Sequence, residues 1–260
     1  MRKTVPSSEQ SLSDTLNVAL PSDGQLYQPT LSFLEECGLG VHRLTTRRYT
    51  AEISTVPGVR VLFQRAADIP GKIDEGSADL AIVGLDRFTE SRRKAGSGFV
   101  VIEDLGFASA ELVIAVPEAW IDVISVADLA DLALEFRQTG RELRVATKYQ
   151  GLVRKFLYRN NINYFTIVPS SGTLEAAPSM GFADIIADIV ETGSTLRENR
   201  LKPLGDGVVF SSQACLIGNR DTLRADKTRL ELTRRILERV EGRLRAHDYY
   251  ALTATIIGPD

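Results

Sequence analysis

Residues 183–196 constrain the fold of this chain more than any other stretch. The segment 183–190 is apolar and β-branched, which predicts a largely buried strand. Asp184 and Asp188 lie two strand periods apart, so both carboxylates are expected on the same face of that strand. The run Thr192-Gly193-Ser194-Thr195 then predicts a turn that leads into a helix. Because two carboxylates are costly on a buried strand, other groups should compensate them.

A strand that passes through a glycine turn into a helix is a suitable place for a phosphate monoester. Backbone N–H groups and the positive end of the helix dipole point out of such a turn, and Thr192, Ser194 and Thr195 add three hydroxyls. Asp188 and Glu191 would lie beside the phosphate, where they can bind sugar hydroxyls or a magnesium ion. The combination favours a phosphoribosyl ligand. The alternative is that the run forms only a helix cap, which is a common use of such a sequence.

The composition is that of a folded protein without a surface for nucleic acid or membranes. With 260 residues, 43% hydrophobic and 25% charged, the chain can form two compact lobes or one larger domain. The formal net charge of -3 provides no positive field for nucleic acid or an anionic membrane. Residues 1–15 lack the apolar core of a secretory signal, and no run reaches the roughly 18 apolar residues of a membrane span. We therefore expect a cytoplasmic protein in which Cys37 and Cys215 are buried thiols.

Strands and helices are expected to alternate along most of the chain. Strands are predicted at 16–20, 59–63, 78–84, 100–105, 110–116, 143–147, 164–168, 207–210 and 213–217. Helices are predicted at 27–37, 70–76, 126–136, 149–159 and 174–180. The alternation predicts an α/β fold with parallel sheets, divided into two lobes with a ligand cleft at the strand ends.

The C-terminal part of the chain has a different character. Residues 222–246 are densely charged and predict a long amphipathic helix, with an apolar stripe at steps of three or four residues formed by Leu230, Thr233, Leu237, Val240 and Leu244. Such a helix more often packs on its own domain than on a partner protein. Segment 249–257 alternates like a strand.

Six ordered motifs between about residues 16 and 219 resemble those of the ATP phosphoribosyltransferase family. They are Ala-Leu-Pro-Ser-Asp-Gly-Gln-Leu (19–26), Arg-Ala-Ala-Asp-Ile-Pro (65–70), Gly-Ser-Ala-Asp-Leu-Ala-Ile-Val-Gly (76–84), Arg-Val-Ala-Thr-Lys-Tyr (144–149), Ser-Gly-Thr-Leu-Glu-Ala-Ala-Pro (171–178) and Asp-Ile-Val-Glu-Thr-Gly-Ser-Thr-Leu-Arg-Glu-Asn (188–199). The resemblance implies two periplasmic-binding-protein-like (type II) lobes with a cleft between them, plus a C-terminal helix. It implies a disordered extension at 1–15, lobe I at 16–106, lobe II at 107–203, a return to lobe I at 204–220, and at 221–260 a linker helix with the first strand of a truncated regulatory domain, as in a long-form member.

The resemblance also implies a reaction. A member of the family transfers the 5-phosphoribosyl group of phosphoribosyl pyrophosphate to N1 of ATP and releases pyrophosphate, with Mg²⁺, in the first step of histidine biosynthesis. Displacement at an anomeric carbon needs positioning and charge stabilisation rather than a protein nucleophile. This agrees with the sequence, in which His42 and His247 lie outside every motif.

By the same resemblance the candidate site residues fall into three groups. The residues expected to bind phosphoribosyl pyrophosphate are Asp188, Glu191, Thr192, Gly193, Ser194, Thr195, Leu196, Ser171, Gly172 and Thr173. The residues expected at the ATP side of the cleft are Gly24, Arg48, Arg65, Gly84 and Asp86. Asp188 is also the candidate magnesium ligand. For Arg48, a solvated surface charge is an equal alternative.

Some positions depart from the pattern of the family and keep other functions open. Asp23 and Gln25 stand where members often have Lys or Arg, and Glu111 replaces an Arg that many members have. Alternatives are therefore a two-lobed small-molecule binding protein and a catalytically weak regulatory paralogue. We expect a homo-oligomer, a dimer or higher, with no nucleic-acid or membrane partner. Since only 249–257 of a regulatory domain would be present, the 260-residue chain is expected to be insensitive to histidine.

Overall fold

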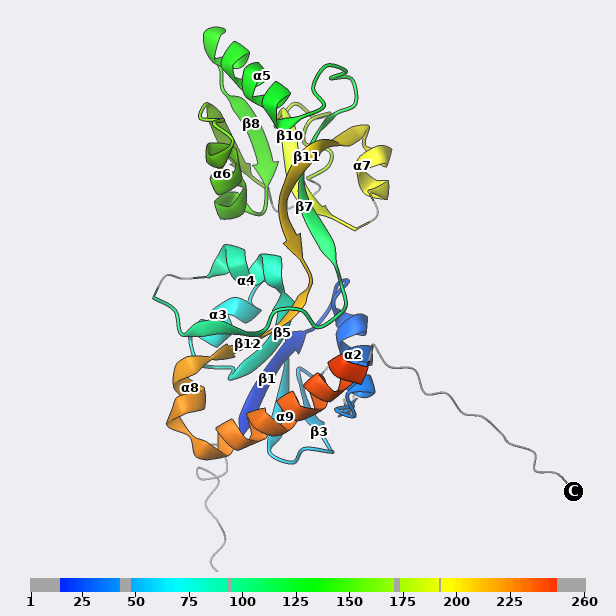
Figure 1. The fold of residues 1–260 in the computed structure, drawn as a ribbon, viewed down its shortest axis with the longest axis vertical. Helices are drawn as coiled ribbons and strands as arrows, with labels where there is room; N and C mark the ends of the chain where they lie inside the picture. Colours follow the sequence, from blue (N-terminus) through cyan, green and yellow to red (C-terminus); the bar gives the residue numbers. More distant parts are fainter. Residues whose placement is uncertain (1–14, 43–47, 93–94, 171–173, 192, 247–260) are drawn as a thin grey trace, which may run out of the picture. The chain divides into compact units, whose positions relative to one another are not determined.

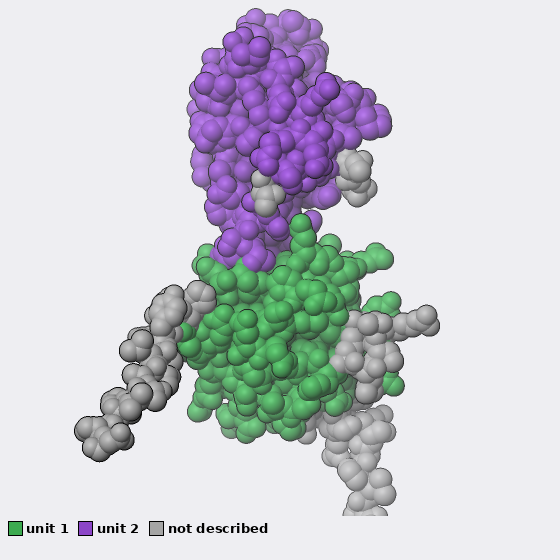
Figure 2. Space-filling view, turned by 90° about the vertical axis from the view of Figure 1, so that its right-hand side faces the viewer, with its two compact units in different colours: residues 1–83, 93–107, 214–260 green, residues 84–92, 108–213 purple. Residues whose placement is uncertain are grey.

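The computed structural model describes residues 15–42, 48–92, 95–170, 174–191 and 193–246 (Figure 1). Within them the chain forms two compact units, which Figure 2 shows in different colours. Unit 1 contains the described parts of 1–83, 93–107 and 214–260, and unit 2 contains those of 84–92 and 108–213. Each unit has its own β-sheet with helices around it, so the chain belongs to the α/β class.

The borders of the units differ in two places from the lobe borders at 106 and 203 that the sequence had led us to expect. Residues 84–92 come between two strands of unit 1, yet they belong to unit 2 because helix α4 (Leu85–Ser91) packs on elements of unit 2. Residues 204–213 also belong to unit 2, because strand β11 (Leu201–Ser212) stays paired with strand β7 (Ala110–Pro117) up to its last residue.

Unit 1 is built on a mixed sheet. Its strands are β1 (Leu16–Pro21), β2 (Val41–His42), β3 (Thr50–Ile53), β4 (Val59–Gln64), β5 (Leu80–Gly84), β6 (Gly98–Ile102) and β12 (Ala214–Asn219), in the order β2-β3-β4-β1-β5-β12-β6. Strand β1 pairs in parallel with β4 and with β5. The pairs β2–β3, β3–β4 and β12–β6 are antiparallel, so the expectation of a parallel sheet is wrong at the two margins. Strands β2 and β3 have two and four residues and were not expected, although β3 alternates between exposed and buried side chains.

The predicted C-terminal helix is present as two helices that follow β12. The helices of unit 1 are α2 (Tyr27–Glu36), α3 (Ile69–Asp74), α8 (Arg220–Ala225) and α9 (Lys227–Ala246). Helix α9 packs on unit 1 through Leu232, Ile236 and Val240, which are buried. Of the expected apolar stripe, Thr233 and Val240 are buried and Leu237 and Leu244 are half-buried, whereas Leu230 is 54% exposed. Val240 is covered by unit 1 itself, so it is not available for a contact with a second copy of the chain.

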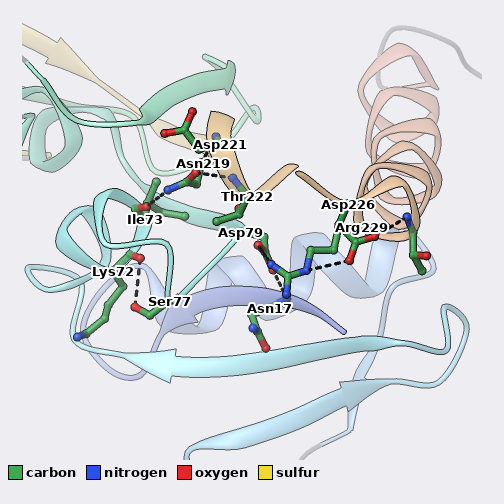
Figure 3. Close-up of polar contacts among 11 residues, drawn as sticks. Asn17, Lys72, Ile73, Ser77, Asp79, Asn219, Asp221, Thr222, Asp226 and Arg229 are labelled. Atoms are coloured by element: carbon green, nitrogen blue, oxygen red, sulfur yellow. Dashed lines mark hydrogen bonds and ion pairs between the residues drawn. The ribbon is translucent and has the colours of Figure 1, made fainter. Parts of the chain in front are cut away.

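A buried ion pair attaches the start of α9 to the sheet of unit 1 (Figure 3). Asp79 is only 1% exposed, and its carboxylate accepts hydrogen bonds from the backbone N–H of Asn17 at 2.8 Å and from Arg229 Nη1 at 3.1 Å. Nearby, Asn219 accepts from the backbone N–H groups of Asp221 and Thr222 and so caps α8. These contacts connect the middle of the sheet with the chain that returns from unit 2.

Unit 2 is built on a second mixed sheet. Its strands are β7, β8 (Leu143–Thr147), β9 (Phe165–Pro169), β10 (Ile185–Val190) and β11, in the order β11-β7-β10-β8-β9, and its helices are α4, α5 (Val126–Gln138), α6 (Gln150–Arg159) and α7 (Ser194–Glu198). Strands β10, β8 and β9 run parallel. Strand β7 is antiparallel to both of its neighbours, β10 and β11.

Both faces of the second sheet are buried. Along β7, Leu112, Ile114 and Val116 lie in the core beneath α5 and α6, whereas Val113 and Ala115 lie in a second core that includes Leu196 of α7. Figure 1 shows α5 and α6 on one side of this sheet and α7 on the other. A strand covered on both faces reads as a continuous apolar run, which is why β7 and β10 were recognised in the sequence.

Several other expectations have clear outcomes. Residues 174–180 form successive turns and not the expected helix. The strands expected at 207–210 and 213–217 are parts of β11 and β12. Cys37 and Cys215 are buried free thiols, as expected, and burial raises the pKa of Cys37 to about 11. No helix in the part of the chain that the structure describes could cross a membrane, given its length and polarity. Expectations for 1–14 and 249–257 fall outside the described residues.

Candidate functional site

Polar side chains collect at one edge of the sheet of unit 2. The carboxyl ends of β8, β9 and β10 meet there because these strands are parallel. The register brings the start of β7 and the end of β11 to the same edge, since Glu111 lies opposite both Val190 and Ser211. We call this region the polar edge and define it by Glu111, Lys148, Ser170, Asp188 and Glu191.

The turn after β10 has the form expected from its sequence. Gly193 has φ 72° and ψ 8°, a left-handed conformation that glycine adopts without steric cost, and α7 begins at the next residue. The side chains of Ser194 and Thr195 are exposed, whereas Leu196 is 3% exposed and holds the helix in the core. Residues 171–173 and Thr192, also expected in this site, lie outside the described residues.

The two aspartates of segment 183–196, Asp184 and Asp188, have different surroundings. Asp184 is 9% exposed and accepts hydrogen bonds from the backbone N–H of Arg144 at 2.8 Å, from Arg144 Nη2 at 3.0 Å and from Arg141 Nη1 at 3.1 Å. Burial acts to raise the pKa of this carboxyl, but the hydrogen bonds from Arg144 and Arg141 outweigh it and hold the pKa below its ordinary value. Asp184 is therefore a compensated, structural carboxylate.

Asp188 lacks such full compensation. Burial raises the pKa of Asp188, and the charge of Glu175 acts in the same direction. The backbone N–H of Ile189 and the positive charges of Lys148 and Arg87 oppose the rise without cancelling it. An ionised carboxylate is thus held at the polar edge at a cost in free energy, as is common for groups that bind a ligand or metal. Among the described residues, no group of three or more His, Cys, Asp or Glu side chains could hold a metal ion.

A buried hydrogen-bonded group lies beside the polar edge. The Tyr149 hydroxyl donates to Asp86 Oδ2 at 2.6 Å, and the Ser212 hydroxyl donates to Asp86 Oδ1 at 2.7 Å. Burial, followed by the nearby charge of Asp86, raises the pKa of Tyr149 far above its ordinary value, so the phenol stays protonated. The Arg87 guanidinium lies 4.7 Å from the centroid of the Tyr149 ring. Asp86, expected at the ATP side of a cleft, has its carboxylate engaged within unit 2.

The other candidates for the ATP side gather at the sheet of unit 1. Gly24 follows β1, Arg65 follows β4 and Gly84 ends β5, and the three parallel strands are neighbours, so these residues lie at one edge. Arg48 precedes β3, whose start pairs with the end of β4. It lines a cavity of about 250 Å³ together with His42 and other side chains of the strands β2–β4. The two groups of candidates therefore belong to different units, with Gly84 at a border between them.

Lys148, which belongs to the polar edge, and Arg87, which contacts Tyr149, were not selected as candidates from the sequence. Lys148 is the residue directly after the buried strand β8, a position where ligand contacts are common in α/β folds, so a signal for it was present. Arg87 carries no such signal. Arg87 follows Asp86 on α4, which lies in the sequence between two strands of unit 1. Only packing within unit 2 brings its side chain to Tyr149.

Solved structures support the fold. A chain of the HisG:HisZ ATP phosphoribosyl transferase complex from Thermotoga maritima superposes with a TM-score of 0.65 at 25% identity, covering 90% of this chain and 100% of that one. The alkanesulfonate-binding protein SsuA from Xanthomonas axonopodis pv. citri superposes with a TM-score of 0.54 at 13% identity, covering 90% and 74% of the two chains. At that identity the second likeness concerns the fold alone, which is the periplasmic-binding-protein-like type expected.

Curated relatives match nearly their full lengths. ATP phosphoribosyltransferase from Mesorhizobium japonicum is 43% identical over 208 residues, which cover 79% of this chain and 90% of that protein. The enzyme from Brucella melitensis biotype 2 is 42% identical over 235 residues, 89% of this chain and 98% of that protein. The Brucella protein thus has almost nothing beyond the matched part, and it gives no support to a long-form assignment. The family model described as "HisG: ATP phosphoribosyltransferase" matches residues 65–242. This chain belongs to the ATP phosphoribosyltransferase family.

Proposed function

We propose that the polar edge of unit 2 binds phosphoribosyl pyrophosphate in the ATP phosphoribosyltransferase reaction. The observation that carries the proposal is the position of the turn 191–196. It follows β10, one of three parallel strands, and lies beside a carboxylate whose pKa burial raises. In an open α/β sheet the carboxyl ends of parallel strands are the usual place for a ligand.

Each part of the polar edge has a proposed role. The turn at Gly193, with the hydroxyls of Ser194 and Thr195, binds the 5-phosphate, because a left-handed glycine lets the ligand approach the backbone closely. Asp188 accepts hydrogen bonds from the ribose hydroxyls, and Glu191 lies three residues further on, at the start of the turn. Lys148 supplies a positive charge to the pyrophosphate. Thr192 and residues 171–173 are proposed to complete the site.

Magnesium is proposed as the cofactor. The side chains of the polar edge fit an ion that is shared between the protein and the substrate. Carboxylates outnumber cations there, but Asp188 alone would hold Mg²⁺ only weakly. Magnesium commonly takes one or two protein carboxylates and completes its shell with substrate phosphates and water. When bound, it would neutralise charge on the pyrophosphate. The remaining contribution of the chain is to bind, to orient and to exclude water.

The ATP side is proposed to lie at the edge of unit 1 formed by Gly24, Arg48, Arg65 and Gly84. Because the reaction needs no protein nucleophile, the protein acts by positioning two anionic substrates and stabilising the charge that develops at the ribose. Asp86 is given no contact with ATP in this proposal, since two hydroxyls already engage its carboxylate.

We further propose that the protein acts in the cytoplasm, where ATP and phosphoribosyl pyrophosphate are both present, and that it assembles with other subunits. The Thermotoga maritima neighbour was solved as a HisG:HisZ complex, which supports assembly with copies of this chain or with a second protein. Light scattering of the purified chain tests self-assembly. A monomer at all concentrations would leave only a second protein as the partner.

An activity assay tests the proposal. Purified protein with ATP, phosphoribosyl pyrophosphate, Mg²⁺ and a pyrophosphatase should form phosphoribosyl-ATP, detected by mass. Asp188→Asn should lower kcat/KM by about 100-fold, the size of effect expected when a charged contact to the reacting sugar is lost. If the wild type forms product and Asp188→Asn has the same kinetic constants, the polar edge is not the binding site for phosphoribosyl pyrophosphate. Binding of phosphoribosyl pyrophosphate without product would favour the binding-protein alternative.

A further inference from the structure

We propose that helix α4 positions the turn between β8 and α6, residues 148–151, so that Lys148 can bind the anionic substrate. In this proposal Asp86, Glu90 and Tyr149 are positioning residues that act through the turn. The inference rests on the proposed function of the polar edge, because Lys148 belongs to that edge.

The first contact fixes Tyr149. Its side chain is 2% exposed, and its hydroxyl donates to Asp86 Oδ2 at 2.6 Å. Asp86 is itself held at the start of α4, because Ser212 donates to Oδ1 at 2.7 Å and accepts from the Asp86 backbone N–H at 3.0 Å. A buried carboxylate with two hydroxyl donors allows little movement, since breaking either bond leaves a buried polar group unpaired.

The second contact fixes the start of α6. Glu90 Oε1 accepts from the backbone N–H of Gly151 at 2.8 Å, and Glu90 Oε2 accepts from that of Leu152 at 3.0 Å. These N–H groups belong to the first turn of α6, where no partner exists within the helix and a negative charge is favourable. The approach is close: a Cβ at position 151 would lie only 3.3 Å from both Glu90 oxygens.

On its other side the turn is attached to β10. The Thr147 hydroxyl donates to the carbonyl of Ala187 at 2.7 Å and accepts from the backbone N–H of Tyr149 at 3.0 Å. Lys148 therefore lies between two residues that are both held. It is also near Asp188: burial raises the pKa of that carboxyl, and the charge of Lys148 is among the groups that lower it.

These contacts explain why α4 packs in unit 2, although in the sequence it lies between two strands of unit 1. Asp86 and Glu90 lie four residues apart, so they project from the same face of α4. Both face the turn 148–151 through the bonds given above. A flexible lysine binds an anion more strongly when its backbone is already ordered, because less conformational entropy is lost on binding.

The test is Tyr149→Phe, which removes the hydroxyl and keeps the ring against Arg87. We expect KM for phosphoribosyl pyrophosphate to rise about tenfold with kcat within about twofold, the pattern of a lost binding contribution. Tyr158→Phe is the matched control, because it makes the same chemical change on α6 at a ring that is 50% exposed. Its KM should equal that of the wild type. Equal KM values for wild type and Tyr149→Phe would overturn the proposal.

A double-mutant cycle tests whether Tyr149 acts through Lys148. Lys148→Gln should raise KM by more than Tyr149→Phe does, and the double variant should be no worse than Lys148→Gln alone, because the positioned charge is already absent. Fully additive losses would show that Tyr149 does not act through Lys148 and would overturn the proposal.

Two further measurements keep the result interpretable. If Tyr149→Phe fails to fold, Glu90→Ala serves in its place, since it removes the carboxylate that accepts from the backbone N–H groups of Gly151 and Leu152; an unchanged KM for phosphoribosyl pyrophosphate would then overturn the proposal. Isothermal titration of the wild type with phosphoribosyl pyrophosphate and Mg²⁺ tests the underlying function. No binding there would refute the proposed function, whereas binding that is equal in wild type and Tyr149→Phe would refute only the role of α4.

Discussion

A carboxylate whose pKa is raised by folding weakens the fold at neutral pH, and one whose pKa is lowered strengthens it. Asp188 in β10 and Asp184, directly before β10, represent the two cases. The sequence predicted two buried carboxylates that need compensation. It could not predict which of them is compensated, because Arg141 and Arg144 are 43 and 40 residues from Asp184 and reach it only after β8 and β10 pair.

The pair gives a prediction of opposite sign at pH 7. Asp188→Asn should raise Tm by about 2–4 °C while activity falls, because the cost of burying that charge disappears. Asp184→Asn should lower the free energy of unfolding by about 2 kcal/mol, the usual contribution of hydrogen bonds to a charged group. Each variant serves as the control for the other, since the chemical change is the same.

The pH dependence distinguishes these charge effects from unspecific ones. The raised pKa of Asp188 means that its carboxyl contributes stability below its unfolded pKa, about 3.9, and loses that contribution as pH rises through the folded value. The gain from Asp188→Asn should therefore shrink as pH falls through the raised folded value, and it should be absent below about 3.9. The lowered pKa of Asp184 means that the loss from Asp184→Asn is present above about 3.9 and fades as pH falls through the folded value. Calorimetric Tm values across pH that run parallel for both variants would contradict the assignment.

At the scale of an element, the turn from β10 to α7 was predicted in detail because each step has a local cause. An apolar run ended, a glycine followed, and hydroxyl residues began the helix. The position of α4 had no local cause. Its side chains Asp86 and Glu90 look like those of any short exposed helix, and their partners Tyr149 and Gly151 are more than 60 residues away. The sequence therefore left α4 unrecognised, and only the family resemblance suggested a substrate contact for Asp86.

Gly193 allows a prediction for that turn. Gly193→Ala should cost about 1 kcal/mol of stability, because an alanine at φ 72° is strained, while the nearest atom to its Cβ, Arg197 Nη1, is at an ordinary 3.5 Å. It should also raise KM for phosphoribosyl pyrophosphate by about tenfold, because the Cβ hinders approach to the backbone. Gly140→Ala is the control: Gly140 has φ 82°, lies after α5 and has open space within 4 Å of the position that a Cβ would take. Equal KM values for the two variants would exclude the turn from the site.

At the scale of the whole molecule, the order of strands along the chain predicted the α/β class, while the partition into units did not follow from it. Strand β11 is the main reason. Periodicity detected only its end, since residues 201–206 include Pro203 and Gly205, which are unfavourable in a regular strand, and the register shifts after Pro203. The prediction for α9 was right for Thr233 and Val240 and wrong for Leu230, and it missed Leu232 and Ile236, which packing on unit 1 buries.

The ion pair between Asp79 and Arg229 joins parts of unit 1 that are 150 residues apart in the sequence, and it gives a prediction for the whole molecule. Arg229→Met should lower the free energy of unfolding by about 3 kcal/mol, because Asp79 remains 1% exposed with its charge no longer paired.

Arg234→Met is the matched control on the same helix. Its ion pair with Glu238 is exposed on both sides, so its loss should cost less than about 0.5 kcal/mol. Urea denaturation measures both, and the kinetic constants of both variants should equal those of the wild type under conditions where they are folded. Similar stabilities for the two variants would mean that the Asp79–Arg229 pair does not hold α9 to the sheet and that the apolar contacts of Leu232, Ile236 and Val240 are sufficient on their own.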